Sequence, residues 1–166
     1  MTDLSLTLSA LTPSDLLGVD KLDDRAFGPG RFALTAYRLR QGCDPDFQLS
    51  CAARVGTLLV GANRMTPIRI GDAPALLLGP VTVDPPFRSR GIARAMIERS
   101  LQAARAAGHK LVLLVGDEPY YKRYDFARTP TGRITMPGPV DAARVLHLEL
   151  ADGAFTEVRG AVSRSI

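Results

Sequence analysis

Apolar residues alternate with polar ones at the start of the chain and again from Phe47 onward, which is the spacing of half-buried β-strands. The first strand is expected at Leu4, Leu6 and Leu8. Two pairs of turn residues, Val55-Gly56 and Gly71-Asp72, divide the second run and predict a three-stranded antiparallel meander. Its strands are expected over residues 47–54, 57–70 and 75–83.

The last strand of the meander, residues 75–83, is apolar on both faces and is therefore expected to lie in the centre of the sheet. It contains Gly79-Pro80, which a regular central strand does not tolerate because proline has no backbone N–H to donate. We expect a β-bulge or a local splaying of the sheet at this point. Bulges are common beside active sites, so this part of the strand is a candidate for function.

Helical signals occupy the segments around these strands. The first helix begins at the N-cap Thr12 and is expected to end before Gly28, and a second is expected over residues 31–41. A third, amphipathic helix follows the meander and ends at Gly108. The buried strand at residues 110–115 then completes a right-handed parallel βαβ unit. Two further strands are expected over residues 133–136 and 145–150.

The composition is that of a folded domain with a sizeable core, since 46% of the 166 residues are hydrophobic and 23% are charged. The predicted elements place the chain in the α/β class, with a mixed sheet in a single domain over residues 1–166. Cys43 and Cys51 are too few for a disulfide scaffold or a zinc site, so we interpret both as reduced packing residues. No membrane-spanning or targeting segment is apparent, and we expect a cytoplasmic protein.

Charge gives the first indication of a ligand. The formal net charge of +4 favours anionic partners. The absence of Trp and the aromatic fraction of 6% weigh against single-stranded nucleic-acid binding, which usually needs stacking surfaces among its basic residues, and a nucleic-acid partner is not expected. Arg88, Arg90 and Arg94 cluster at the start of the third helix, where the aligned peptide dipoles already supply positive charge. The cluster therefore predicts a bound phosphate or pyrophosphate, and Gly91 leaves room for it because glycine has no Cβ.

Other patterns typical of ligand sites carry less information. Residues 28–33 match the dinucleotide fingerprint G-x-G-x-x-A, but they follow a helical pattern, so we interpret them as a turn between helices. The Walker A pattern of nucleoside triphosphatases is absent from the sequence. His109 and His147 have no partner spacing that indicates a catalytic triad or a metal site, and no metal is expected.

Residues 83–93 read VDPPFRSRGIA and closely resemble the acetyl-CoA motif of the GNAT superfamily of N-acetyltransferases. Arg88, Gly91 and Ala93 occupy the defining positions of its core, Q/R-x-x-G-x-G/A. The order of the predicted elements also fits this superfamily. The resemblance implies a GNAT-like fold, in which an antiparallel meander is followed by a βαβ unit with splayed central strands. It also implies acetyl-CoA (coenzyme A) as the cofactor.

The resemblance further implies which residues act on the cofactor. The backbone amides of residues 88–94 would hold the CoA pyrophosphate, and the strand end would pair with pantetheine, with the N–H of Val83 directed at the thioester carbonyl. The full cofactor-binding set is Val81, Thr82, Val83, Arg88, Ser89, Arg90, Gly91, Ile92, Ala93 and Arg94. Tyr121, in the family signature Y-x-x-x-G-F, would be the general acid that protonates the departing CoA thiolate.

The sequence departs from the family pattern in two places. Asp125 stands where the family usually has glycine, but aspartate tolerates the left-handed backbone conformation, so the turn is expected to survive. An asparagine that often follows the second strand of the βαβ unit is missing, and residues 116–118 stand there instead. Asp117 or Glu118 could act as the general base, although Asp117 is equally plausible as the cap of the next short helix.

The resemblance implies an N-acetyltransferase that moves the acetyl group to a primary amine of a small molecule or peptide by direct attack. The alternative is a non-catalytic acyl-CoA-binding regulatory domain, in which Asp125 marks a relaxed active site. Acceptor specificity is expected to lie in loops, with candidates at residues 23–32, Tyr37 and residues 129–139. The sequence is compatible with a monomer or a homodimer.

Overall fold

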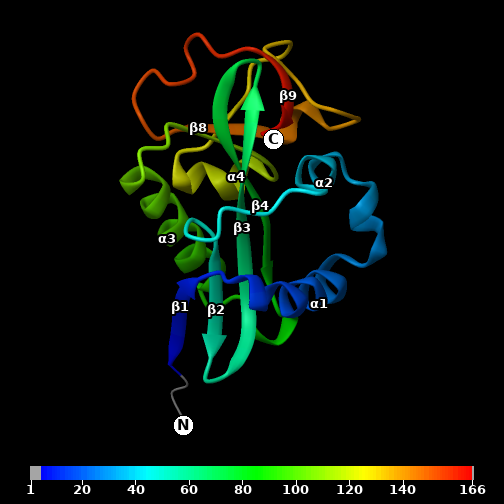
Figure 1. The fold of residues 1–166 in the computed structure, drawn as a ribbon, viewed down its shortest axis with the longest axis vertical. Helices are drawn as coiled ribbons and strands as arrows, with labels where there is room; N and C mark the ends of the chain where they lie inside the picture. Colours follow the sequence, from blue (N-terminus) through cyan, green and yellow to red (C-terminus); the bar gives the residue numbers. More distant parts are fainter. Residues whose placement is uncertain (1–4, 166) are drawn as a thin grey trace.

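The computed structural model describes residues 5–165, except for the side chains of residues 32 and 33, and Leu4 of the predicted first strand lies outside that range. A long twisted sheet forms the centre of the molecule (Figure 1). Its strands are β1 (Leu6–Ala10), β2 (Cys51–Val55), β3 (Leu58–Ile70), β4 (Ala73–Val83), β5 (Leu111–Val115), β6 (Ala127–Arg128), β7 (Ile134–Thr135), β8 (Val145–Glu149) and β9 (Gly160–Arg164). The helices are α1 (Leu16–Phe27), α2 (Thr35–Arg40), α3 (Ile92–Ala106) and α4 (Glu118–Tyr121), with 3-10 turns at Pro13–Asp15, Pro29–Ala33, Pro85–Phe87, Lys122–Tyr124 and Ala142–Arg144.

The sheet has the strand order β1-β2-β3-β4-β5-β8-β6, and β9 pairs with both β3 and β7. Strands β2, β3 and β4 form the antiparallel meander that the turn pairs predict. Strand β5 runs parallel to β4 after the α3 crossover, so the βαβ unit is also confirmed. The mixed α/β fold expected from the sequence is therefore present.

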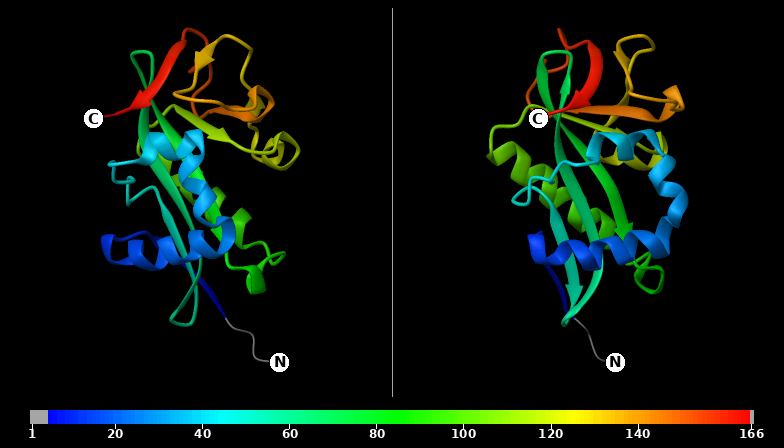
Figure 2. Two further views of the ribbon diagram at one scale, coloured as in Figure 1. Left: turned by 90° about the vertical axis from the view of Figure 1, so that its right-hand side faces the viewer. Right: turned by 45° about the vertical axis from the view of Figure 1, so that its right-hand side comes forward.

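Helices cover both faces of the sheet, and Figure 2 shows α1 and α3 on opposite sides of it. Side chains alternate between the two faces along a strand, so Ala52 packs beneath α1 while Cys51 and Ala53 pack beneath α3. The face toward α3 is filled mainly by Met65, Leu76, Leu78, Ile97, Leu101 and Val112. Cys51 is fully buried and both cysteines are free, in keeping with packing residues. In the described part of the chain, no helix has the length and apolarity that a bilayer crossing requires.

The centre of the sheet opens where the sequence predicts it. In the register between β3 and β4, Gly79 and Pro80 together stand opposite the single residue Arg64, which is a β-bulge. Beyond that point β4 and β5 separate, because their parallel pairing covers only Leu76 and Leu77 of β4. Both expected consequences of Gly79-Pro80, the bulge and the splaying, are therefore confirmed.

Two predicted elements differ from the structure. The helix expected over residues 31–41 is split, because Leu34 adopts an extended conformation between a 3-10 turn and α2. The strand expected over residues 47–54 begins only at Cys51, since Asp46 folds residues 47–50 into a turn. Its backbone carbonyl accepts from the N–H groups of Leu49 and Ser50, and its carboxylate accepts from that of Gln48. Hydrogen bonds to both the backbone carbonyl and the carboxylate of Asp46 thus override the alternating pattern.

Candidate active site

Strand β4 presents free backbone donors where the sheet opens. The N–H of Asp84 donates to the carbonyl of Val60 at 2.8 Å, which makes these two residues a hydrogen-bonded pair of the β3–β4 ladder. Because bonded and open positions alternate along antiparallel strands, the N–H groups of Val81 and Val83 point to the other edge of β4. Strand β5 has already separated there, so an extended ligand can pair with this edge.

The start of α3 is arranged for an anion. Its N-cap, Gly91, has the left-handed φ of 78°, and no side chain caps the free N–H groups of the first turn. The first turn contains no acidic residue, and Glu98 one turn later is paired with Arg94 at 2.9 Å. A Cβ built on Gly91 would meet nothing within 4 Å, so the space beside the helix start is open. The helix dipole and the free amides therefore favour a bound phosphate group here.

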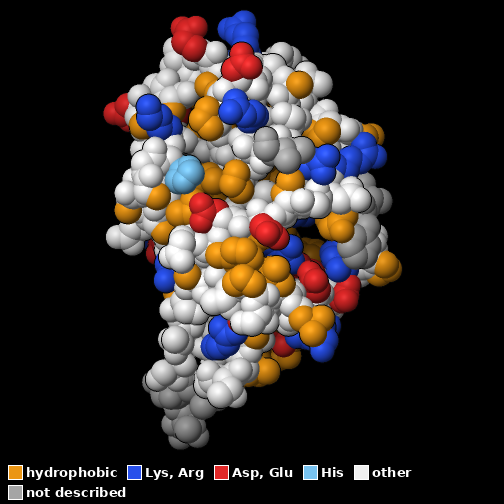
Figure 3. Space-filling model, in the orientation of Figure 1, with side chains coloured by type: hydrophobic (Ala, Val, Ile, Leu, Met, Phe, Trp, Pro, Cys, Tyr) orange, Lys and Arg blue, Asp and Glu red, His pale blue; other side chains and the backbone are white. Residues whose placement is uncertain are grey.

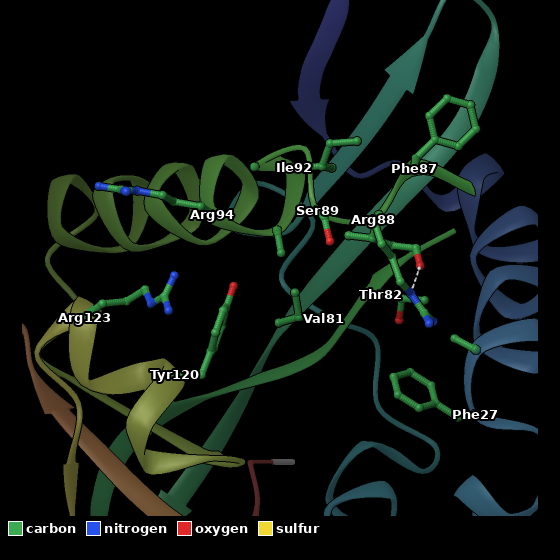
Figure 4. Close-up of a pocket in the computed structure, with 14 residues that line it drawn as sticks. Phe27, Val81, Thr82, Phe87, Arg88, Ser89, Ile92, Arg94, Tyr120 and Arg123 are labelled. Carbon is green, nitrogen blue, oxygen red and sulfur yellow. Dashed lines mark hydrogen bonds between the residues drawn. The ribbon is translucent and has the colours of Figure 1, made fainter. Parts of the chain in front are cut away.

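A cavity of about 590 Å³, which we call the α3 cavity, lies between the start of α3, β4 and the α4 segment (Figure 4). Every residue predicted to bind the cofactor lines it except Arg90, whose guanidinium lies 5.4 Å above the ring of Phe87. The side chain of Arg88 lies against the end of β4, where its Nε donates to the backbone carbonyl of Val83 at 3.2 Å. The remaining walls come from Ala26, Phe27, Phe87, Tyr120 and Arg123.

A second cavity of about 670 Å³, the β4–β5 cavity, occupies the gap where β4 and β5 part. It shares Phe27, Val81 and Tyr120 with the α3 cavity, so the two spaces adjoin along the edge of β4. The surface of the molecule is hollowed between the sheet and the segment that contains helices α1 and α2, with basic and acidic side chains at the rim (Figure 3). The structure therefore offers one elongated site with two compartments.

Tyr121 lies in the β4–β5 cavity and not in the α3 cavity, next to the point where the two meet. Its ring packs edge-on against Phe126, with centroids 5.9 Å apart, and against Gly116, where any Cβ would come within 2.6 Å of the ring. Burial, with smaller contributions from Tyr120 and Asp117, raises the pKa of Tyr121 to about 12. The phenol therefore keeps its proton at neutral pH and can serve as a donor.

The other tyrosines of the segment form the wall between the cavities. The hydroxyl groups of Tyr120 and Tyr124 are 3.1 Å apart and share a hydrogen bond, and the guanidinium of Arg123 lies 4.6 Å above the ring of Tyr120. Tyr124 is buried and lines neither cavity, whereas Tyr120 faces both. Tyr120 is therefore a wall residue that the two cavities share.

The two acidic residues that follow β5, Asp117 and Glu118, have different surroundings in the structure. The Asp117 carboxylate accepts from Arg144 Nη1 at 2.6 Å and lines the β4–β5 cavity. Asp117 also occupies the N-cap position of α4, as the capping alternative expects, but its side chain makes no capping hydrogen bond. Glu118 faces Arg128 at 3.5 Å and lines neither cavity.

Several cavity residues come from segments that carry no recognisable motif. Phe27 and Arg31 lie within the predicted acceptor segment at residues 23–32, and Pro139 ends another, but Tyr37 does not line either cavity. The sequence gives no signal for Arg40 or Asp141, which also line the β4–β5 cavity. They reach it only through the tertiary fold.

A buried hydrogen bond connects helix α1 to strand β4. Thr82 of β4 donates its hydroxyl to the carboxylate of Asp23 at 2.7 Å, and both side chains are buried. Burial raises the pKa of the Asp23 carboxyl, while the hydrogen bond and the charge of Arg64 act in the opposite direction. The bond holds α1 beside the edge of β4 that the two cavities share.

Asp125 adopts a left-handed backbone conformation with a φ of 71°, so the turn expected at this position is present. We expect Asp125→Gly to raise the free energy of unfolding by up to about 1 kcal/mol, because it relieves the strain of a non-glycine residue in this region. Asp125→Ala should lower it by a similar amount, since alanine tolerates the conformation less well than aspartate. Thermal unfolding of the three proteins measures the order, and an alanine variant as stable as wild type would contradict this account.

Known proteins similar to this chain include several acetyltransferases. A family model described as an acetyltransferase (GNAT) domain matches residues 8–129. The chain is 28% identical over 154 residues to the uncharacterized N-acetyltransferase YhbS of Escherichia coli strain K12, a match that covers 90% of each protein. The crystal structure of E. coli YhbS in complex with CoA has a TM-score of 0.83 at 22% identity, covering 99% of this chain and 92% of that one.

Two further solved structures share the fold. A GNAT family acetyltransferase of Brucella melitensis in complex with acetyl-CoA has a TM-score of 0.69 at 22% identity, covering 98% of this chain and 97% of that one. Arabidopsis thaliana Naa50, in complex with the bisubstrate analogue CoA-Ac-MVNAL, has a TM-score of 0.63 at 17% identity and covers 87% and 98%. The family model spans most of the chain, which contains both the motif at residues 83–93 and the splayed sheet. The protein therefore belongs to the GNAT acetyltransferase family, and the enzyme class that the sequence predicts is confirmed.

Proposed function

We propose that the protein transfers the acetyl group of acetyl-CoA to a primary amine of a small molecule or peptide, by direct attack and without a covalent enzyme intermediate. The observation that carries the proposal is the continuity of the site. An uncapped, basic helix start adjoins the open edge of β4, and this edge leads to a second cavity that contains the protonated phenol of Tyr121. The complexes of YhbS with CoA and of the Brucella protein with acetyl-CoA support this choice of cosubstrate.

The residues around the α3 cavity fit CoA. The free amides at the start of α3, with Arg88 and Arg94 beside them, would hold the pyrophosphate. The N–H groups of Val81 and Val83 point to the open edge of β4, where that of Val83 would pair with an amide of pantetheine. Acetyl-CoA, when bound, supplies the activated acetyl thioester.

Three groups of the chain would then act on the reaction. We assign the N–H of Val81, rather than that of Val83, to donate to the thioester carbonyl oxygen as negative charge develops on it, because Val81 lines both cavities whereas Val83 lines only the α3 cavity. Tyr121 Oη holds the proton that the departing sulfur takes up. Of the two candidate bases only Asp117 lines the β4–β5 cavity, so we assign it to receive the amine proton, directly or through water.

The regulatory alternative has no observation in its favour. Asp125, the residue that suggests this alternative, adopts the left-handed turn, and Tyr121 lies inside the cavity. A peptide acceptor is supported by Naa50, whose bisubstrate analogue carries a peptide. That the enzyme consists of one domain over residues 1–166 and works in the cytoplasm stays a prediction from the sequence.

Calorimetric titration of the purified protein with acetyl-CoA tests the proposal, and we expect a dissociation constant in the micromolar range. A panel of primary amines is then assayed for the release of free CoA thiol. Thiol release that requires both acetyl-CoA and an amine supports the transferase. Binding without thiol release would favour the regulatory domain, and absence of acetyl-CoA binding would refute both.

A further inference from the structure

One arginine of the β4–β5 cavity, Arg40, belongs to no sequence motif and has no role in the site described above. Arg40 ends the short helix α2 and is only partly exposed, and it lines the wall of the cavity that α1 and α2 form. Two other arginines line the same cavity, but each has a carboxylate of its own. Arg31 is paired with Asp24 and Arg144 with Asp117.

Within the part of the chain that the structure describes, the guanidinium of Arg40 has no ion pair or hydrogen bond. The carboxylate that attracts it, Asp23, already accepts from Thr82 and faces Arg64 at 3.5 Å. Arg64 in turn repels Arg40. Arg40 therefore extends its charge into the cavity without a counter-ion in direct contact.

Burial disfavours the charged form of the Arg40 guanidinium. Burial, together with the charge of Arg64, lowers the pKa of Arg40 to about 10, so the guanidinium is destabilised but still charged at neutral pH. A partly buried cation is stabilised by an anion that forms charge-assisted hydrogen bonds with it. Since every other ligand-facing cation of this cavity is paired, the missing anion is expected to arrive with a ligand.

We propose that the acceptor amine also carries an oxyanion, a carboxylate or a phosphate, and that Arg40 binds it in the β4–β5 cavity. This inference rests on the proposed function. Asp117 and Tyr121 lie on the α4 wall of the same cavity, so the amine of such an acceptor would face the reacting groups while its anion faces the α2 wall. Apolar side chains of Leu34, Pro80 and Val140 line the space as well and suit a small organic body. A molecule with an amine and an acid at its two ends, such as an amino acid, has this chemistry.

The test compares acceptors that differ only in the oxyanion. The wild-type enzyme is assayed with acetyl-CoA and each proteinogenic L-amino acid against its α-amide, and with phosphoethanolamine against ethanolamine. We expect at least one pair in which the oxyanion member has a kcat/KM about tenfold or more above that of its neutral partner, as the gain of a charge-assisted hydrogen bond implies. The amino-acid pairs identify a carboxylate, and the phosphoethanolamine pair identifies a phosphate.

Arg40→Met then removes the charge while keeping an unbranched side chain. The preference within the pair is expected to fall to about one, and Arg40→Lys is expected to restore part of it. Arg38→Met is the matched control, because Arg38 lies on the same helix, is exposed and does not line the cavity. It should retain the wild-type preference. Acetyl-CoA affinity, measured for every variant, reports whether the fold and the α3 cavity are intact.

Three results would overturn the inference. The first is that neutral partners react as well as the oxyanion members throughout, the second is that the preference survives Arg40→Met, and the third is that no pair reacts although acetyl-CoA binds. Failure of the wild-type protein to bind acetyl-CoA would instead contradict the proposed function. The two failures are therefore distinguishable.

Discussion

Replacing Tyr121 with phenylalanine is expected to lower kcat by roughly 10²- to 10⁴-fold, the usual contribution of a general acid. The substitution removes one hydroxyl group from a ring that Phe126 and Gly116 hold in place, so the shape of the β4–β5 cavity is kept. Since Tyr121 does not line the α3 cavity, the affinity for acetyl-CoA should change little. Steady-state kinetics with an accepted amine, together with an acetyl-CoA titration, separates the two effects.

Tyr124→Phe is the matched control for this prediction. It removes a phenol from the same segment, but Tyr124 lines neither cavity and its hydroxyl contacts only that of Tyr120 among the described residues. Its kcat is expected to stay within a few-fold of wild type, as for the loss of one partly exposed hydrogen bond. If the two phenylalanine variants were equally active, Tyr121 would not be the acid.

Gly91→Val is expected to weaken acetyl-CoA binding by about tenfold or more. Valine is strained at a φ of 78°, and its branched side chain would occupy the open space beside the first amides of α3, where the pyrophosphate is expected to bind. The measurement is the dissociation constant for acetyl-CoA, determined well below the unfolding temperature of the variant.

Gly108→Val separates strain from ligand contact. Gly108 follows the other end of the same helix with a φ of 86°, and a Cβ there also meets nothing within 4 Å. Both valine variants should therefore lose a similar stability, on the order of 1–2 kcal/mol. Only Gly91→Val should also lose affinity. Equal dissociation constants for the two variants would contradict the assignment of the anion site to the start of α3.

The cofactor side of the site could be predicted from the sequence because its signals are local. The arginines at the start of α3, the glycine among them and the proline in β4 lie within residues 79–94, and each acts on the backbone next to it. A helix start, a bulge and a left-handed turn are short-range features, so neighbouring residues are sufficient to indicate them. The turn at Asp125 is a further example.

The acceptor side could not be predicted, because it is assembled from distant segments. Arg40 and Asp141 line the same cavity as Asp117 only after α1 and α2 have folded over the sheet, a placement that depends on contacts such as that of Asp23 with Thr82. No spacing in the sequence records such contacts. Strand β9 was missed for the same reason, since a short strand with Val162 as its buried apolar residue is defined by its pairing with β3 and not by its own pattern.

The two cavities adjoin, but their walls come from different parts of the chain. One compartment comes mostly from a single continuous stretch, so its parts are inherited together and are hard to vary singly. The walls of the other are supplied by separate segments, and one side chain there can be exchanged without moving the helix start that we propose to hold the cosubstrate. New acceptors can thus be acquired by piecemeal substitution while the source of the acetyl group stays the same.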